Sequence, residues 1–248
     1  MKVYCSYSKD LDRFIKKVVK RILNDNAQQL NLVSLEEIEL LNKSEFTYLS
    51  DAKTLEGGKI VLSSRLFELL PTYNLKLLKN NNDYKMLVGT LYHEMIHISD
   101  MKLLPNLYKC VIDNNNLTRF LVALFWIEYL TEKMSCGYID VDYSEACTEF
   151  SKSNWECNMS DLYSNYNQSN FFYLTKYIPY FMARTRDYSK RKIYLNMMNN
   201  DLLKDYIEAL GMELELLESI ERFDDVSLLK NLYTIMNKYY KKFMNEYG

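Results

Sequence analysis

Both histidines of this 248-residue chain stand in a single five-residue run, His93-Glu94-Met95-Ile96-His97. Residues four apart lie on one face of a helix, so the two imidazoles can act together only if this segment is helical. On a helix, two imidazoles so placed can bind one metal ion, and Glu94 lies close enough to act on a water molecule at that ion. The run therefore predicts a helix with a metal-binding face.

The spacing of the run is the HExxH pattern of zinc-dependent hydrolases. It predicts zinc bound by His93 and His97, with Glu94 as the general base. Met86, Gly89 and Thr90 continue the histidine stripe at spacings of three and four, which indicates a buried face. Gly89 lowers helix stability by about 1 kcal/mol relative to alanine, so we interpret it as a point of close packing by a strand or a ligand. The alternative is an accidental motif with solvated surface histidines.

A catalytic zinc site needs three protein ligands and an open position for water. With both histidines used, the third ligand must be Glu, Asp or Cys. Glu128 is the best candidate, because it is the one carboxylate in the otherwise apolar or aromatic stretch 121–130. Burying an unpaired charge costs several kcal/mol, and metal coordination would offset that cost. Glu132 is the rival, but it stands where the stretch turns polar, which favours an exposed acid or a neighbour of the ligands.

Two other side chains near these residues have open interpretations. Asp100, three residues after His97, either orients an imidazole or is a solvated acid at the helix end. Cys136, two turns after Glu128, is a weaker candidate for a metal neighbour. The five cysteines are odd in number and include no CxxC pair, so we expect reduced thiols rather than disulfides or a structural zinc site.

The segment from Glu128 to Ser135, Glu-Tyr-Leu-Thr-Glu-Lys-Met-Ser, resembles the E-x-x-A-N-x-F-A element of the ImmA/IrrE-like metallopeptidases. These are gluzincins, often encoded on phages and mobile elements, in which a glutamate on the helix after HExxH completes the site. Thr131 and Ser135 replace the alanines, and Glu132 replaces the asparagine. The likeness covers approximately residues 35–136 and implies that Glu128 is a zinc ligand. Some relatives cleave a repressor of a mobile element, whereas others are regulators with little protease activity.

The sequence before the HExxH run predicts a small sheet. Three short apolar or β-branched runs, separated by turn-like residues at 42–44 and 56–58, are expected to be strands: 38–41, 46–50 and 59–63. Helices are expected around 11–23 and 64–70. In gluzincin-like proteases the strand before the active-site helix forms the edge of the cleft, and the resemblance suggests 59–63 for that position. A substrate could add to such a strand by backbone hydrogen bonds, although an ordinary edge strand is the alternative.

After Gly137 the chain is expected to be helical. Apolar residues recur at spacings of three and four in four segments: 143–158, 171–186, 202–219 and 226–247. The expected fold is mostly helical α+β, with a sheet of about three strands packed on the HExxH helix and the Glu128 helix. We expect a zincin-like catalytic region over 1–136 and a helical region over 137–248, with a soft boundary because no Pro- or Ser-rich linker occurs. Tyr180, Arg184 and Arg186 share an expected helix and are candidate donors to an oxyanion.

The net charge and the hydropathy of the chain limit the kinds of partner that we expect. A net charge of -2 argues against a nucleic-acid-binding face. The longest apolar stretch is too short to span a bilayer, and the N-terminus has no charged segment followed by an apolar core. We therefore expect a cytoplasmic protein that acts on a protein or peptide, without a membrane or direct nucleic-acid partner. The sequence does not indicate the oligomeric state.

The leading functional hypothesis is a zinc metallopeptidase, a hydrolase in which Glu94 takes a proton from a zinc-activated water and passes it to the leaving amine. The first alternative is a non-catalytic zinc-containing binding or regulatory protein, whose fourth metal position is closed by Asp100 or Cys136. The second alternative is hydrolysis of a non-peptide amide by the same residues.

Overall fold

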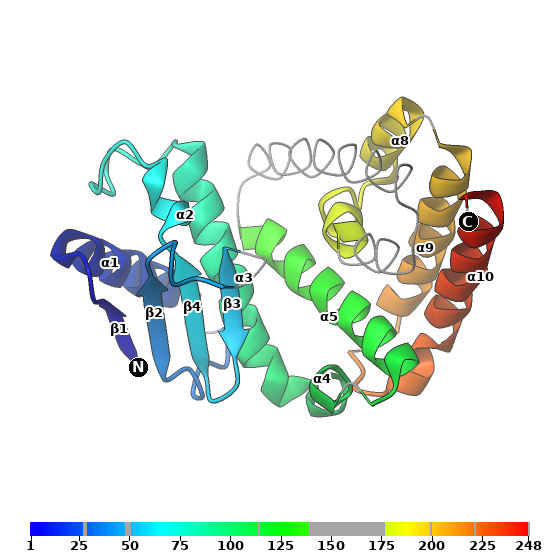
Figure 1. Ribbon diagram of the computed structural model, residues 1–248, viewed down its shortest axis with the longest axis horizontal. Helices are drawn as coiled ribbons and strands as arrows, with labels where there is room; N and C mark the ends of the chain where they lie inside the picture. Colours follow the sequence, from blue (N-terminus) through cyan, green and yellow to red (C-terminus); the bar gives the residue numbers. More distant parts are fainter. Residues whose placement is uncertain are drawn as a thin grey trace. The chain divides into compact units, whose positions relative to one another are not determined.

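The computed structural model describes residues 1–26, 29–47, 51–113, 115–138, 177–198, 200–220 and 222–247. These residues form a mostly helical α+β fold with one four-stranded mixed sheet, which confirms the expected fold class (Figure 1). The chain divides into two compact units. The first contains Met1–Leu103 and the end of α5 (Leu117–Tyr138) from Met134 on, and the second contains Leu104–Lys133 and the described residues from 177 on.

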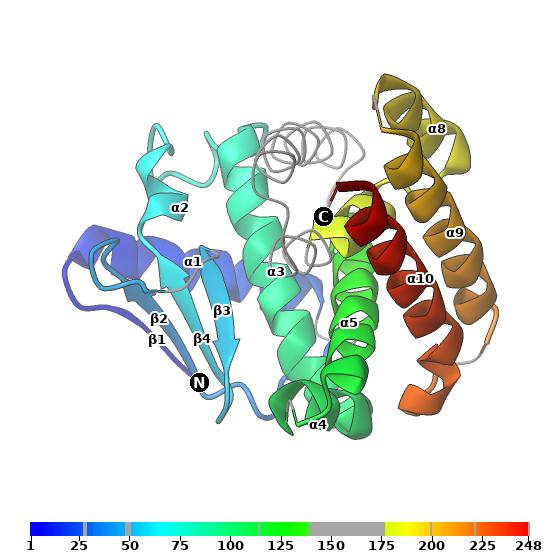
Figure 2. The same cartoon turned by 45° about the vertical axis from the view of Figure 1, so that its right-hand side comes forward.

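The first unit holds the sheet and three helices besides the end of α5. Its elements are β1 (Lys2–Cys5), α1 (Lys9–Asp25), β2 (Glu37–Leu41), β3 (Ala52–Leu55), β4 (Lys59–Ser63), α2 (Arg65–Glu68) and α3 (Asn82–Leu103). The strand order is β1-β2-β4-β3, with β1, β2 and β4 parallel and β3 antiparallel to β4. Helices α1 and α3 lie on one face of the sheet (Figure 2).

The sheet differs from the expected one in its outer strands. The structure has a fourth strand, β1, near Met1. Of the strand expected over 46–50, residues 46 and 47 lie outside any strand, and 48–50 lie outside the described residues. The strand at this place in the chain is β3, four residues long. The turn expected at 56–58 connects it to β4, and Gly57 and Gly58 adopt φ values of 78° and 73°, which glycine adopts without steric cost.

This hairpin also changes which strand is the edge. Strand β4 pairs with β2 on one side and with β3 on the other, so the expectation that 59–63 forms the edge is wrong. Among the described residues, the edge strand on this side of the sheet is β3, which packs beside α3. In the β3–β4 register Thr54 lies opposite Ile60, so both side chains point to the same face of the sheet. That face is the one covered by the helices.

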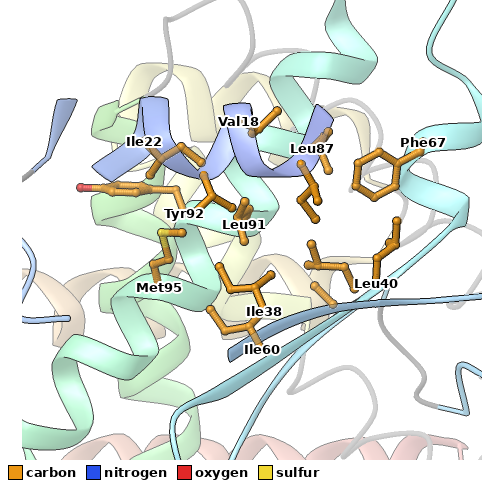
Figure 3. Close-up of a cluster of buried hydrophobic side chains, with 14 of the residues drawn as sticks. Val18, Ile22, Ile38, Leu40, Ile60, Phe67, Leu87, Leu91, Tyr92 and Met95 are labelled. Carbon is orange, nitrogen blue, oxygen red and sulfur yellow. The ribbon is translucent and has the colours of Figure 1, made fainter. Parts of the chain in front are cut away.

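The core of the first unit lies between this face and the helices (Figure 3). Ile38 and Ile60 pair across β2 and β4, and both are fully buried. From α3, Leu91 and Met95 pack into the same cluster, and α1 adds Val18. This packing explains the apolar spacing of both helices and holds α3 against the sheet.

The end of α5 is fixed on α3 within the first unit. The Ser135 hydroxyl donates a hydrogen bond to the Gly89 carbonyl oxygen at 3.1 Å. The rings of Tyr138 and Tyr92 lie 4.4 Å apart between centroids, and the Tyr138 hydroxyl donates to Asp25 at 3.0 Å. Burial and the contact with this carboxylate raise the pKa of Tyr138 to about 12. At Gly89, the helix that contacts α3 is α5, through the hydrogen bond from Ser135 to the Gly89 carbonyl oxygen.

The second unit is helical where it is described. It contains α4 (Pro105–Asp113), most of α5, a helical segment at 177–184, α8 (Tyr188–Met197), α9 (Asp201–Glu218), the 3-10 helix η1 (Val226–Leu229) and α10 (Lys230–Tyr247). The helices expected at 202–219 and 226–247 correspond to α9 and to η1 with α10, whereas the one expected at 143–158 lies outside the described residues. Tyr206 and Tyr239 stack between α9 and α10, with ring centroids 5.0 Å apart. No helix in the described part of the chain is both long enough and apolar enough to cross a membrane.

Candidate metal centre

Helix α3 carries the HExxH run in its buried half. Asn81 caps the helix, since its side-chain oxygen accepts a hydrogen bond from the Tyr84 backbone N–H at 2.8 Å. All ten residues from 91 to 100 are buried. His93, Glu94 and His97 are 6%, 9% and 8% exposed, so the histidines are not solvated surface residues. Of the expected inward-facing stripe, Gly89, His93 and His97 are buried, whereas Met86 and Thr90 are half-buried.

The imidazoles of His93 and His97 approach each other through their Nε2 atoms. The Nε2 atoms of His93 and His97 are 3.1 Å apart, and the ring planes are inclined at 80°. Two nitrogens bound to one tetrahedral zinc at ordinary zinc–nitrogen lengths would lie about 3.3 Å apart. The spacing therefore fits two ligands of one ion. In the metal-free protein, an Nε2–H group of one ring would donate a hydrogen bond to the unprotonated Nε2 of the other.

Helical periodicity explains why Glu128 lies near the two histidines. Gly89 lies one turn before His93 on the same face of α3, and Ser135 lies two turns after Glu128 on the same face of α5. The hydrogen bond from Ser135 to Gly89 joins these two faces. One ligand atom each from His93, His97 and Glu128 lies within 4.8 Å of the other two. The structure thus brings together the three residues that the sequence predicts as ligands.

The donor set suits zinc better than a harder cation. Two imidazole nitrogens and one carboxylate oxygen are common zinc ligands, whereas calcium and magnesium prefer oxygen donors alone. Among the described residues, the side chains that lie close enough together to bind one ion here are those of His93, His97 and Glu128. Neither Asp100 nor Cys136 belongs to this group. Asp100 is 2% exposed, which rules out a solvated acid at the helix end. The described residues of this group therefore fit a metal ion that accepts both nitrogen and oxygen ligands, as zinc does.

The helical segment 177–184 contacts the glutamates of α5. The Tyr180 hydroxyl donates a hydrogen bond to Oε2 of Glu128 at 2.6 Å. One turn later, Nε of Arg184 donates to Oε1 of Glu132 at 2.5 Å. Glu132 is 7% exposed, so it is a buried, ion-paired acid rather than an exposed one, and it is not part of the metal-binding group. Two of the candidate oxyanion donors thus contact the carboxylates of α5.

One neighbour of Glu94 has no counterpart in the sequence predictions. The Thr54 hydroxyl lies 2.7 Å from Oε2 of Glu94 and 3.1 Å from the Glu94 backbone carbonyl oxygen. A hydroxyl has one proton, so it donates to one of these oxygens at a time. Thr54 was missed because it belongs to the unexpected strand β3. The strand sequence Ala-Lys-Thr-Leu does not alternate apolar with polar residues, so the sequence carried little signal for the inward face of Thr54.

The fold and the residues define a recognisable class of site. HExxH on one helix and a glutamate on a second helix, around a position that fits one metal ion, are consistent with an HExxH…E zincin-like site. None of the protein-family models, curated proteins or solved structures compared with the chain matches it. The assignment of the site to this class therefore rests on the geometry of the site alone.

Proposed function

We propose that this protein is a zinc-dependent metallopeptidase, similar to the ImmA/IrrE-like enzymes, with its catalytic region within residues 1–136. The observation that supports this most directly is the grouping of His93, His97 and Glu128 ligand atoms within 4.8 Å of one another, next to a buried Glu94. A glutamate adjacent in sequence to a metal-ligating histidine can act as the general base on a water at the ion.

The chemistry divides between the ion and the side chains. Zinc, when bound, supplies a Lewis acid that polarises a peptide carbonyl and lowers the pKa of a water molecule. His93, His97 and Glu128 would hold the ion, and the carboxylate of Glu94 would accept a proton from the attacking water and then, as the carboxylic acid, donate it to the nitrogen of the leaving amine. The Thr54 hydroxyl, 2.7 Å from Oε2, holds this carboxylate in a fixed orientation.

The substrate class we propose is a protein or peptide segment in an extended conformation. In the part of the sheet that the structure describes, β3 is the edge strand beside α3, and Thr54 on this strand contacts Glu94. A peptide that adds to an edge strand gains backbone hydrogen bonds, and side-chain pockets supply the specificity. Cleavage of one regulatory protein, as in some members of the ImmA/IrrE-like family, is consistent with such a site.

Catalysis is favoured over a purely structural zinc site by the number of ligands. A structural zinc ion is normally held by four protein ligands, which leaves no position for a reacting water. The group found among the described residues has three, and neither of the residues considered for closing it, Asp100 and Cys136, belongs to it.

Zinc removal and restoration test the proposal directly. We expect the purified protein to contain one equivalent of zinc, to cleave members of a mixed peptide library, to lose cleavage when a chelator removes the metal and to regain it when zinc is added back. Mass spectrometry of the library identifies the cut bonds. Zinc without cleavage of any peptide or candidate protein would favour a zinc-containing binding protein, and absence of bound metal would make the HExxH run coincidental.

Replacing Thr54 by valine should slow hydrolysis without releasing zinc. The substitution keeps the shape of the side chain and removes the hydroxyl that contacts Glu94. A hydrogen bond to a charged group contributes about 1.5–3 kcal/mol, so we expect kcat to fall by about tenfold to a hundredfold. Thr54→Ser retains the hydroxyl and should restore most of kcat. Equal kcat values for Thr54→Val and wild type would remove the orienting role of Thr54.

A further inference from the structure

Two polar contacts join the helical segment 177–184 to α5 in matching register. Tyr180 and Arg184 are one helical turn apart, as are their partners Glu128 and Glu132. The Arg184 guanidinium also lies over the Tyr180 ring, 5.6 Å from its centroid. The buried ion pair between Arg184 and Glu132 therefore holds the segment at the height along α5 at which the Tyr180 hydroxyl meets Glu128.

The hydrogen bond from Tyr180 restricts the side chain of Glu128, which is flexible. A glutamate has three side-chain torsions, and immobilising them to bind a metal costs conformational entropy. A phenol hydroxyl 2.6 Å from Oε2 is at the short end of the range for O–H···O bonds and favours one orientation of the carboxylate. Part of the ordering needed for metal binding is then present before the ion arrives. Partners that orient metal ligands in this way typically change metal affinity by about tenfold to a hundredfold.

We propose that Tyr180 is a positioning residue for the metal centre, which orients Glu128 and so raises the affinity of the protein for zinc. This inference rests on the proposed function only in taking Glu128 as a zinc ligand, and it does not require that the protein cleave peptides. It assigns to the helical segment 177–184 a part in metal binding, although none of its residues belongs to the His93, His97 and Glu128 group.

The test is the zinc affinity of full-length Tyr180→Phe, measured by competition with a chromogenic chelator. Phenylalanine keeps the ring beneath Arg184 and removes only the hydroxyl. We expect zinc to bind about tenfold to a hundredfold more weakly than in wild type. The matched control is Tyr129→Phe, which removes the hydrogen bond between the Tyr129 hydroxyl and the Glu218 carboxylate, one residue along α5 from Glu128. Its zinc affinity should equal that of wild type.

A double-mutant cycle separates an effect through Glu128 from a general structural effect. In the Glu128→Ala background, Tyr180→Phe should leave the residual zinc affinity unchanged, because the residue through which it acts is absent. Thermal unfolding of the metal-free proteins shows whether either tyrosine variant is damaged. Equal zinc affinity in wild type and Tyr180→Phe, or an equal loss in both Glu128 backgrounds, would overturn the role of Tyr180 and leave the proposed peptidase intact. A wild-type protein that binds no zinc would overturn both.

Discussion

Glu94→Gln is expected to bind one equivalent of zinc and to lose peptide hydrolysis. Glutamine has the size of glutamate, and its side-chain oxygen can still accept the hydrogen bond from Thr54, so neither the fold nor the ligand positions should change. It lacks the basic carboxylate that takes a proton from water. General acid–base catalysis contributes about a hundredfold to ten-thousandfold in rate, and we expect a loss of that order in kcat. Peptide cleavage rates and zinc content of the same preparations measure both effects.

The control for this variant is Glu56→Gln. Glu56 is an exposed acid in the turn between β3 and β4, in the same compact unit as Glu94, and its neutralisation should leave kcat unchanged. Cleavage that persists undiminished in Glu94→Gln would exclude Glu94 as the general base. A variant that loses both zinc and cleavage would instead indicate that Glu94 supports the metal centre structurally.

Glu128→Ala is expected to release zinc, whereas Glu132→Ala is expected to retain it. Only Glu128 belongs to the group whose ligand atoms come within 4.8 Å. A ligand that binds only the folded state stabilises it by about 4 kcal/mol when present at a thousandfold its dissociation constant. Glu128→Ala should therefore lose most of the zinc-induced rise in melting temperature that wild type shows, and bound zinc can be counted after gel filtration.

Glu132→Ala provides the comparison because it removes the neighbouring buried carboxylate. The substitution breaks the ion pair with Arg184, and we expect it to lower the stability of the metal-free protein by about 1–3 kcal/mol. Its zinc content should remain near one equivalent. Equal zinc contents in the Glu128 and Glu132 variants would remove the preference for Glu128 as the ligand.

The parts of the site that the sequence predicts are those with a short-range pattern. HExxH is a helical spacing, and the helix around it is long and periodic, so the position and burial of His93 and His97 follow from local rules. The pairing of this helix with Glu128 follows from a second local anomaly, the single carboxylate within the stretch 121–130. The α+β fold class follows from the same helices and from β2 and β4, whose apolar residues stand out in the sequence.

The parts that the sequence does not predict depend on pairing between distant segments. Strand β3 is short and contains Lys53 and Thr54, so it carries little apolar signal and is defined by its hydrogen bonds to β4. The contact of Thr54 with Glu94 depends on that pairing. Likewise, Tyr180 is one of 22 tyrosines, and its contact with Glu128 depends on the packing of two helices far apart in the chain. No spacing rule within one element contains this information.

The facing imidazoles also make the chain suited to magnetic resonance. Because His93 and His97 are the two histidines of the sequence, every imidazole signal in a spectrum of the protein comes from a pair of rings whose Nε2 atoms lie 3.1 Å apart. Isotope labelling of histidine alone would therefore report on these rings without background from elsewhere in the chain. The tautomer of each ring and its exchange with solvent could then be followed as an ion enters or leaves.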